Sequence, residues 1–223
     1  MKRKPPDHFL VFGHRGSPGA HPENTLASFR AALEQEADGF ETDLRQLSDG
    51  TIVLFHDSAV GGKALITISP EEFSELVPDA AVLGDLGQIA GDGFLVLEVK
   101  EPGMEEQIIE AVAGWSGVIV CSFDHSIIET FSKRGVDFDL GLTVREYRRD
   151  LAERLPDLGA NWFFPRWDVI DEDVVNVFHE AGARIVPWTA NRLNQWNRLV
   201  DIGCDGAITD LPGDAIAWRR EKF

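Results

Sequence analysis

Short apolar segments typical of buried β-strands alternate along this chain with segments of helical pattern. Eight strands are expected, at residues 9–14, 39–44, 93–100, 118–123, 140–144, 161–164, 184–189 and 206–210. Helices are expected at residues 25–36, 104–115, 126–134, 147–155, 172–181, 193–200 and 214–221. In the first of them, Leu26, Phe29 and Leu33 recur at the spacing of one helix face. Strands that alternate with helices form parallel sheets.

Eight parallel strands with intervening helices predict an α/β fold of the TIM (β/α)8 barrel type. A doubly wound open sheet is the competing architecture, but no GxGxxG motif follows the first strand. A further strand at residues 51–55 is expected as a hairpin-like excursion after the second barrel strand, and Ser69-Pro70 is typical of a helix start. We therefore expect a single domain over residues 1–223, with a short insertion at about 58–92.

The charge of the chain limits its partners. The formal net charge is −17 and the pI is about 4.6, which argues against general binding to nucleic acid or to anionic membranes. No apolar run approaches the ~20 residues of a membrane span. The basic residues Lys2, Arg3 and Lys4 precede Pro5-Pro6 instead of the apolar core of a signal peptide. We expect a cytoplasmic protein without stable membrane association, and the sequence does not indicate its oligomeric state.

Carboxylates occur at paired positions within two of the expected strands. Glu41 and Asp43 are two residues apart, so a strand would place both on one face, where they repel each other unless a cation lies between them. Glu98 and Lys100 share a face of the third strand in the same way. Because active sites of TIM barrels lie at the C-terminal ends of the strands, Glu98 is expected to converge with the first pair. Three carboxylates would form an oxygen site for one divalent cation, Mg²⁺ or Ca²⁺.

Several short motifs occur in a fixed order between residues 13 and 212. They are Gly13-His14-Arg15-Gly16, Pro22-Glu23-Asn24-Thr25, Glu41-Thr42-Asp43, Asp49-Gly50, His56-Asp57, Glu98-Val99-Lys100, Ser122-Phe123, Trp188-Thr189-Ala190-Asn191 and Thr209-Asp210-Leu211-Pro212. Short pieces such as Ser-Phe are weak by themselves, but the ordered set is specific. In this set the chain resembles the glycerophosphodiester phosphodiesterase (GDPD) family.

The resemblance implies an enzyme that hydrolyses glycerophosphodiesters to sn-glycerol 3-phosphate and an alcohol with the help of a divalent cation. It also implies roles by motif position: metal ligands Glu41, Asp43 and Glu98, acid–base residues His14 and His56, and phosphate contacts Arg15 and Lys100. These residue types suit the chemistry, because arginine binds phosphate through parallel hydrogen bonds and histidine exchanges protons near neutral pH. Either histidine can be the base. The nucleophile can be water, or the glycerol hydroxyl through a cyclic phosphate.

Other residues carry two interpretations each. Trp188 either packs in the core or forms a wall of the substrate site that receives glycerol. Asn24 either caps a helix or also braces the site. Asp57 and Asp210 are interpreted as structural. Cys121 and Cys204 have no metal-binding or CxxC spacing, and Cys121 is expected in the core.

Two alternative functions follow from the same residues. A phospholipase D-like enzyme acting on lysophospholipids would need an exposed apolar strip, for which Val60, Leu65, Ile66 and Ile68 are the candidates. A non-catalytic phosphate-binding barrel conflicts with the complete set of acidic, basic and histidine residues. The resemblance also implies a longer segment before the Glu-x-Lys strand than residues 58–97 provide. We expect a short cap and an open site, and the sequence does not give the alcohol that is released.

Overall fold

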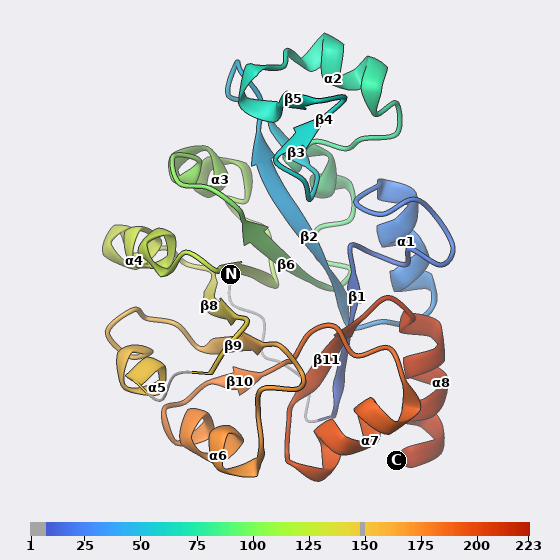
Figure 1. Ribbon diagram of the computed structural model, residues 1–223, viewed down its shortest axis with the longest axis vertical. Helices are drawn as coiled ribbons and strands as arrows, with labels where there is room; N and C mark the ends of the chain where they lie inside the picture. Colours follow the sequence, from blue (N-terminus) through green and yellow to red (C-terminus); the bar gives the residue numbers. More distant parts are fainter. Residues whose placement is uncertain (1–7, 148–149) are drawn as a thin grey trace.

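The computed structural model, which describes residues 8–147 and 150–223, is a TIM barrel (Figure 1). Its eight parallel strands are β1 (Leu10–His14), β2 (Gly39–Gln46), β6 (Phe94–Val99), β7 (Val118–Ser122), β8 (Asp139–Val144), β9 (Trp162–Pro165), β10 (Arg184–Ile185) and β11 (Gly206–Thr209). The hydrogen-bonded order is β10-β9-β8-β7-β6-β2-β1-β11. Two backbone hydrogen bonds join the β11 end of this order to the β10 end: Asp205 N donates to Ile185 O at 2.9 Å, and Ile208 N donates to Pro187 O at 2.8 Å. The predicted strands and their parallel arrangement are confirmed.

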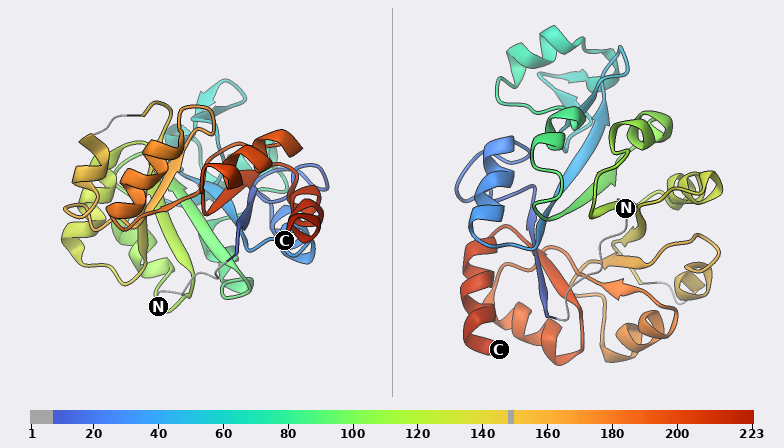
Figure 2. Two further views of the ribbon diagram at one scale, coloured as in Figure 1. Left: turned by 90° about the horizontal axis from the view of Figure 1, so that it is seen from below. Right: turned by 180° about the vertical axis from the view of Figure 1, so that it is seen from behind.

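Helices surround the ring of strands on the outside (Figures 1 and 2). They are α1 (Leu26–Glu34), α3 (Glu105–Ala111), α4 (His125–Arg134), α5 (Asp150–Arg154), α6 (Glu172–Glu180), α7 (Leu193–Asp201) and α8 (Pro212–Lys222). Capping side chains explain some starts: Thr25 accepts from Ser28 N, and Asp171 accepts from Val174 N. The helix expected at 147–155 is observed as α5, and residues 148–149 of that prediction lie outside the described residues.

Alternation along the strands separates two apolar layers. Val11 packs outward toward the helices, whereas Phe12 points into the barrel. Inside, Trp162 stacks on Phe164 at a centroid distance of 6.0 Å and packs against Phe12 and Phe94. These rings fill the barrel interior with apolar side chains below the site.

The insertion forms a small layer of its own beside the end of β2 (Figures 1 and 2). β3 (Ile52–Leu54) pairs with β2 in antiparallel orientation, as expected for a hairpin-like excursion after the second barrel strand. The remaining elements are β4 (Ala59–Val60), β5 (Lys63–Ala64), the 3₁₀ helix η1 (Leu65–Thr67), α2 (Pro70–Leu76) and the 3₁₀ helix η2 (Leu83–Gln88). Leu65, Ile68 and Phe73 build its core. In the part of the chain that the structure describes, no helix has both the length and the apolar character needed to cross a membrane.

We expect Gly39→Ala to destabilise the barrel. A Cβ at Gly39 would lie 2.1 Å from the carbonyl oxygen of Phe94, so β2 and β6 would have to separate. Overpacking of this kind lowers the free energy of unfolding by about 2–3 kcal/mol, measurable by urea denaturation followed by circular dichroism.

Gly84→Ala is the matched control, because nothing lies within 4 Å of its added Cβ. Equal stability of the two variants would contradict the close approach of β2 to β6.

Candidate active site

The loop after β1 places two basic side chains over the barrel. A Cβ at Gly13 would lie 2.1 Å from Gly16 O, and Gly16 has φ of +92° with Ser28 backbone 2.6 Å from its would-be Cβ. Only glycine fits these two positions without a shift of the backbone. The resulting tight turn sets His14 at the end of β1 and Arg15 beside the mouth of the barrel.

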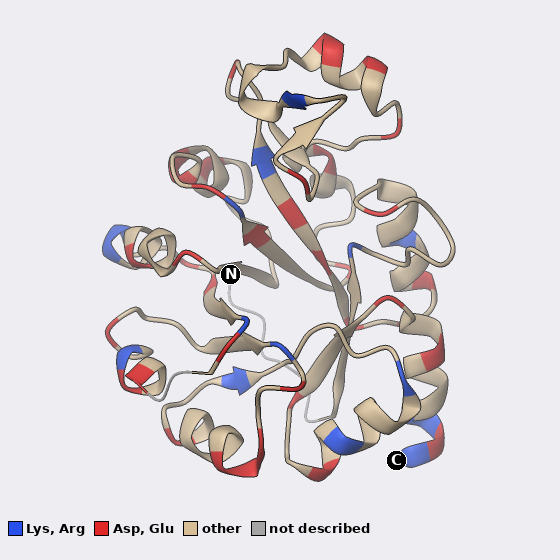
Figure 3. Cartoon of the chain, viewed as in Figure 1, with Lys and Arg blue, Asp and Glu red and all other residues tan. Residues whose placement is uncertain are grey.

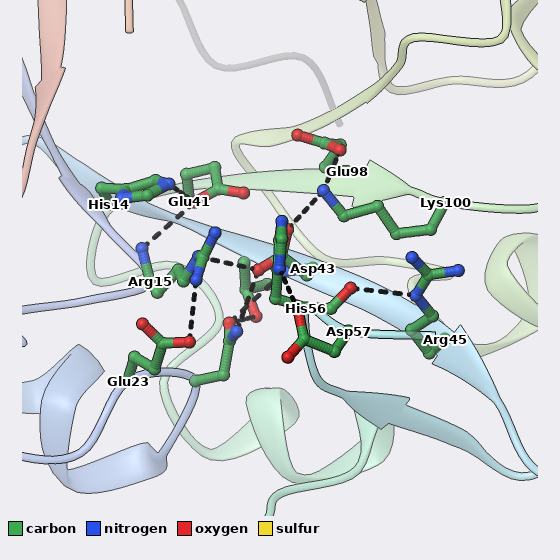
Figure 4. A network of polar contacts seen from close by, with 12 residues as sticks. His14, Arg15, Glu23, Glu41, Asp43, Arg45, His56, Asp57, Glu98 and Lys100 are labelled. Atoms are coloured by element: carbon green, nitrogen blue, oxygen red, sulfur yellow. Dashed lines mark hydrogen bonds and ion pairs between the residues drawn. The ribbon is translucent and has the colours of Figure 1, made fainter. Parts of the chain in front are cut away.

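The three predicted carboxylates converge. Asp43 of β2 lies opposite Glu98 of β6 in the strand register, and Glu41 is two residues earlier on the same face. One oxygen from each lies within 4.8 Å of the others, and all three side chains are buried. Figure 3 shows the acidic segments inside β2 and β6, and Figure 4 shows how the carboxylates lie. The arrangement suits a hard divalent cation.

Burial makes this cluster hard to ionise fully. Loss of solvent and the neighbouring charge of Asp43 raise the pKa of Glu41 to about 8, and burial also raises the pKa of Glu98. Burial acts in the same direction on Asp43, but the charges of Lys100 and Arg15 outweigh it and lower its pKa. Without a cation between them, Glu41 and Glu98 are therefore harder to ionise than Asp43.

Two basic residues neutralise part of the cluster. Lys100 Nζ lies 2.7 Å from Asp43 Oδ1 and also pairs with Glu98, as Figure 4 shows. Arg15 Nε lies 3.1 Å from Asp43 Oδ2, and its backbone N–H donates to Glu41 Oε2 at 3.1 Å. Both side chains line the pocket, so the residues predicted to contact phosphate lie next to those predicted to bind metal.

The two predicted acid–base histidines line the same pocket. Burial by itself would lower the pKa of His14. The hydrogen bond of its Nδ1 to Asp210 Oδ1 (2.7 Å) and the charge of Glu41 outweigh that effect, so the pKa is raised. His56 follows β3, and its Nδ1 lies 2.8 Å from Asp57 Oδ1. The Nε2 side of each ring is therefore available to the pocket.

Asp210 and Asp57, interpreted from the sequence as structural, each contact a histidine. Asn191 holds Asp210 in turn: its amide nitrogen donates to Asp210 Oδ2 at 2.5 Å, and its amide oxygen accepts from Asp210 N at 2.8 Å. The sequence offered a signal for this contact, because the strand that ends at Asp210 neighbours the first strand when the barrel closes.

Asn24 braces the strand that carries Glu41 and Asp43. Its Nδ2 donates to Asp43 Oδ2 at 2.9 Å, and its Oδ1 accepts from the Thr42 hydroxyl at 2.8 Å. Thr25, not Asn24, supplies the side-chain cap of α1. The structure thus supports the bracing interpretation of the Pro22–Thr25 motif.

An aromatic wall lies across the pocket from the carboxylates. Trp188 lines the pocket, donates from Nε1 to Phe164 O at 2.9 Å, and packs edge-on against Phe123 at 5.4 Å. Phe123, Thr143 and Arg145 also line it, although the sequence did not single them out for a substrate role. None of residues 58–92, all of which are described, lines this pocket. The insertion therefore contributes no side chain to the lining of this pocket.

Comparisons of the sequence and of the structure find similarity to the same group of enzymes. A family model described as the glycerophosphoryl diester phosphodiesterase family matches residues 14–69 and 95–214. A glycerophosphodiester phosphodiesterase of Caldanaerobacter subterraneus subsp. tengcongensis is 31% identical over 246 residues, covering 95% of this chain and 98% of the relative. A crystal structure of such an enzyme from Thermotoga maritima superimposes with a TM-score of 0.85 at 24% identity, covering 94% of this chain and 98% of that one.

One solved relative carries a ligand. An Oleispira antarctica phosphodiesterase, determined in complex with the product sn-glycerol-3-phosphate, has a TM-score of 0.80 at 25% identity. The match covers 94% of this chain and 96% of that one.

We expect the stability of the metal-free protein to fall as pH rises from about 4.5 to about 8. Glu41 has its pKa raised from 4.5 to about 8, so the folded state favours the protonated carboxyl and loses stability as that proton leaves. Thermal unfolding across this pH range should show a steeper fall for the wild type than for Glu41→Gln. The difference between pH 5 and pH 9 is expected to be about 2–4 kcal/mol.

Added Mg²⁺ or Ca²⁺ should raise the melting temperature of the wild type at pH 8 and not that of Glu41→Gln. Glu34→Gln, an exposed change on α1, is the control and should follow the wild type. Identical pH profiles for wild type and Glu41→Gln would contradict the burial of an ionisable cluster.

We expect Asp210→Asn to lower the pKa of His14, because it removes the negative charge 2.7 Å from Nδ1. NMR titration of the histidine Cε1–H signals of the metal-free protein, with His14 assigned by His14→Gln, measures the change. Asp57→Asn should leave the His14 titration as it is. A His14 titration unaffected by Asp210→Asn would show that the pair does not form in solution.

Proposed function

Because the chain belongs to the glycerophosphoryl diester phosphodiesterase family, we propose that it hydrolyses glycerophosphodiesters to sn-glycerol 3-phosphate and an alcohol. The observation that carries the proposal is one pocket at the C-terminal ends of the strands. It brings together three carboxylates, two histidines and two basic side chains: Glu41, Asp43, Glu98, His14, His56, Arg15 and Lys100. The ligand of the Oleispira antarctica relative supports the glycerol phosphate half of the substrate.

We propose that Glu41, Asp43 and Glu98 hold one divalent cation, Mg²⁺ or Ca²⁺. The donor set fits, since it consists of carboxylate oxygens only. Burial and the charge of Asp43 raise the pKa of Glu41, and a bound cation would oppose both effects. When bound, such an ion neutralises charge on the phosphoryl oxygens and acts as a Lewis acid. Carboxylate oxygens that bound the ion would no longer pair with Lys100, which would free its ammonium group.

Arg15 and Lys100 then serve the phosphodiester. The guanidinium offers parallel hydrogen bonds to two phosphate oxygens, and the ammonium supplies a point charge from the adjoining strand. Glu23, which accepts from Arg15 Nη1 at 2.8 Å, holds the guanidinium beside the pocket. Trp188 and Phe123 form the apolar wall against which the glycerol carbons pack.

His14 and His56 exchange the protons of the reaction. One ring nitrogen removes the proton of the attacking hydroxyl, a P–O bond forms, and the P–O bond to the alcohol breaks as the other imidazolium protonates the leaving oxygen. Asp210 and Asp57 hold Nδ1 of the two rings, which leaves Nε2 as the reacting nitrogen. The same residues serve attack by water and attack by the glycerol hydroxyl followed by opening of a cyclic phosphate.

The burial of two residues of the insertion gives the lysophospholipid alternative less support than the proposed function has. Of the four residues considered for an exposed apolar strip, Leu65 and Ile68 are 2% and 0% exposed. Ile66 is 57% exposed. We accordingly propose a small glycerophosphodiester as the substrate. We also propose that the chain acts as one domain in the cytoplasm. We further propose that it binds neither nucleic acid nor a stable membrane partner, and its net charge of −17 supports this second point.

We expect the purified protein to release sn-glycerol 3-phosphate from glycerophosphocholine, glycerophosphoethanolamine or glycerophosphoglycerol with Mg²⁺ or Ca²⁺, and not with chelator. His14→Ala and His56→Ala should each lower kcat by about 10²–10⁴-fold, since each removes a proton-transfer group. An enzyme-coupled assay for sn-glycerol 3-phosphate measures the rate.

His179→Ala is the matched control, because His179 pairs with Asp205 (2.8 Å), which precedes β11 at the opposite end of the barrel. Its activity should match the wild type. No turnover of any diester with either ion would overturn the proposed function, and turnover of lysophosphatidylcholine alone would favour the phospholipase D-like alternative.

A further inference from the structure

A third basic side chain, Arg145, lines the active-site pocket away from the first two. Arg15 follows β1 and Lys100 follows β6, whereas Arg145 follows β8. The sheet order separates β8 from β2 by β7 and β6, so Arg145 lies across the pocket from the Glu41–Asp43 strand. Arg145 is therefore placed to contact a part of the bound substrate other than the scissile phosphate.

The guanidinium of Arg145 differs from the other two basic groups in its lack of a carboxylate partner within residues 8–147 and 150–223. Arg15 and Lys100 both pair with carboxylates of the cluster. Among residues 8–147 and 150–223, by contrast, no carboxylate forms an ion pair with Arg145, and its side chain is exposed to the pocket mouth. An unpaired guanidinium at the rim of a pocket remains available to an anionic group of a ligand.

Arg145 is held in place by an aromatic ring. Its guanidinium carbon lies 5.0 Å from the centroid of Phe123, within the range of a cation–π contact. Lys100 Nζ lies 5.9 Å from the same centroid. Phe123 also packs edge-on against Trp188. The ring that would otherwise attract a quaternary ammonium already has two cations near it, which disfavours a cationic ligand group there.

The strand beneath Arg145 supplies a second polar group. Thr143 is two residues earlier, so the two side chains share the face that lines the pocket, while Val144 packs into the outer layer. The buried Thr143 hydroxyl has no oxygen or nitrogen partner among the described residues, and its polar neighbour is the thiol of Cys121. A buried hydroxyl without an oxygen or nitrogen partner is available for a hydrogen bond with a ligand in the pocket.

We propose that Arg145 selects glycerophosphodiesters whose leaving alcohol carries an anionic group, a carboxylate or a phosphate, over those whose alcohol is only cationic. The inference rests on the proposed function and adds the class of alcohol, which the sequence leaves open. The scissile phosphate lies with Arg15 and Lys100 on one side, and the anionic group of the alcohol meets Arg145 on the other. Specificity of this kind combines attraction of one group with repulsion of its competitor.

Two matched substrate pairs test the proposal. Glycerophosphoserine differs from glycerophosphoethanolamine by one carboxylate, and glycerophosphoinositol 4-phosphate differs from glycerophosphoinositol by one phosphate. We expect kcat/KM to be higher for the anionic member of at least one pair by roughly fivefold to tenfold, the size expected of a partly exposed charge-assisted contact. Glycerophosphocholine should be the poorest substrate.

Variants assign the preference to Arg145. Arg145→Gln should bring the ratio within the preferred pair close to one, Arg145→Glu should invert it, and Arg145→Lys should keep part of it. Arg166→Gln is the matched control, because Arg166 follows β9, pairs with Asp168 and does not line the pocket. Thermal unfolding of each variant checks that the fold is intact.

The outcomes separate the two proposals. Hydrolysis without a preference in either pair, or a ratio unchanged in Arg145→Gln, overturns the role of Arg145 and leaves the proposed function standing. Absence of hydrolysis overturns the proposed function. Calorimetric titration with the same pairs then decides the inference, since tighter binding of the anionic members that is lost in Arg145→Gln supports it and equal binding overturns it.

Discussion

The site depends on the forced proximity of three buried carboxylates. Register between β2 and β6 sets Asp43 beside Glu98, and the pleat of β2 adds Glu41 on the same face. Their mutual repulsion raises the free energy of the folded state unless protons, basic side chains or a metal ion compensate. Lys100, Arg15 and the amide of Asn24 supply part of that compensation from three separate segments. The same arrangement is the basis of the proposed cation site.

Closure of the barrel connects this cluster to His14 and its partner Asp210. β11 lies next to β1, so Asp210 at the end of one strand reaches His14 at the end of the other. Asn191, which follows the short β10, fixes Asp210 from the neighbouring position in the ring. The orientation of His14 thus depends on the first and last strands being neighbours. Residues nearly two hundred positions apart in the chain form this contact.

The insertion shapes the site by leaving it open. Its side chains build a small core around Leu65, Ile68 and Phe73 at the end of β2, and none of them lines the pocket. The wall opposite the carboxylates consequently comes from the barrel itself, from the residues that follow β7, β8 and β10. Phe123, Arg145 and Trp188 form this wall, which combines apolar surface with one positive charge.

The sequence by itself determined the eight strands and the parallel barrel, because apolar runs and helical periodicity are local properties of the chain. It also identified Glu41, Asp43, Glu98, His14 and His56 as site candidates, since barrel geometry brings strand ends together. Only the tertiary structure decided that Asp210 holds His14, that Asn24 braces Asp43, and that Arg145 stands over Phe123. Those contacts depend on strand register, ring closure and side-chain direction, which join residues distant in the sequence and leave no local pattern.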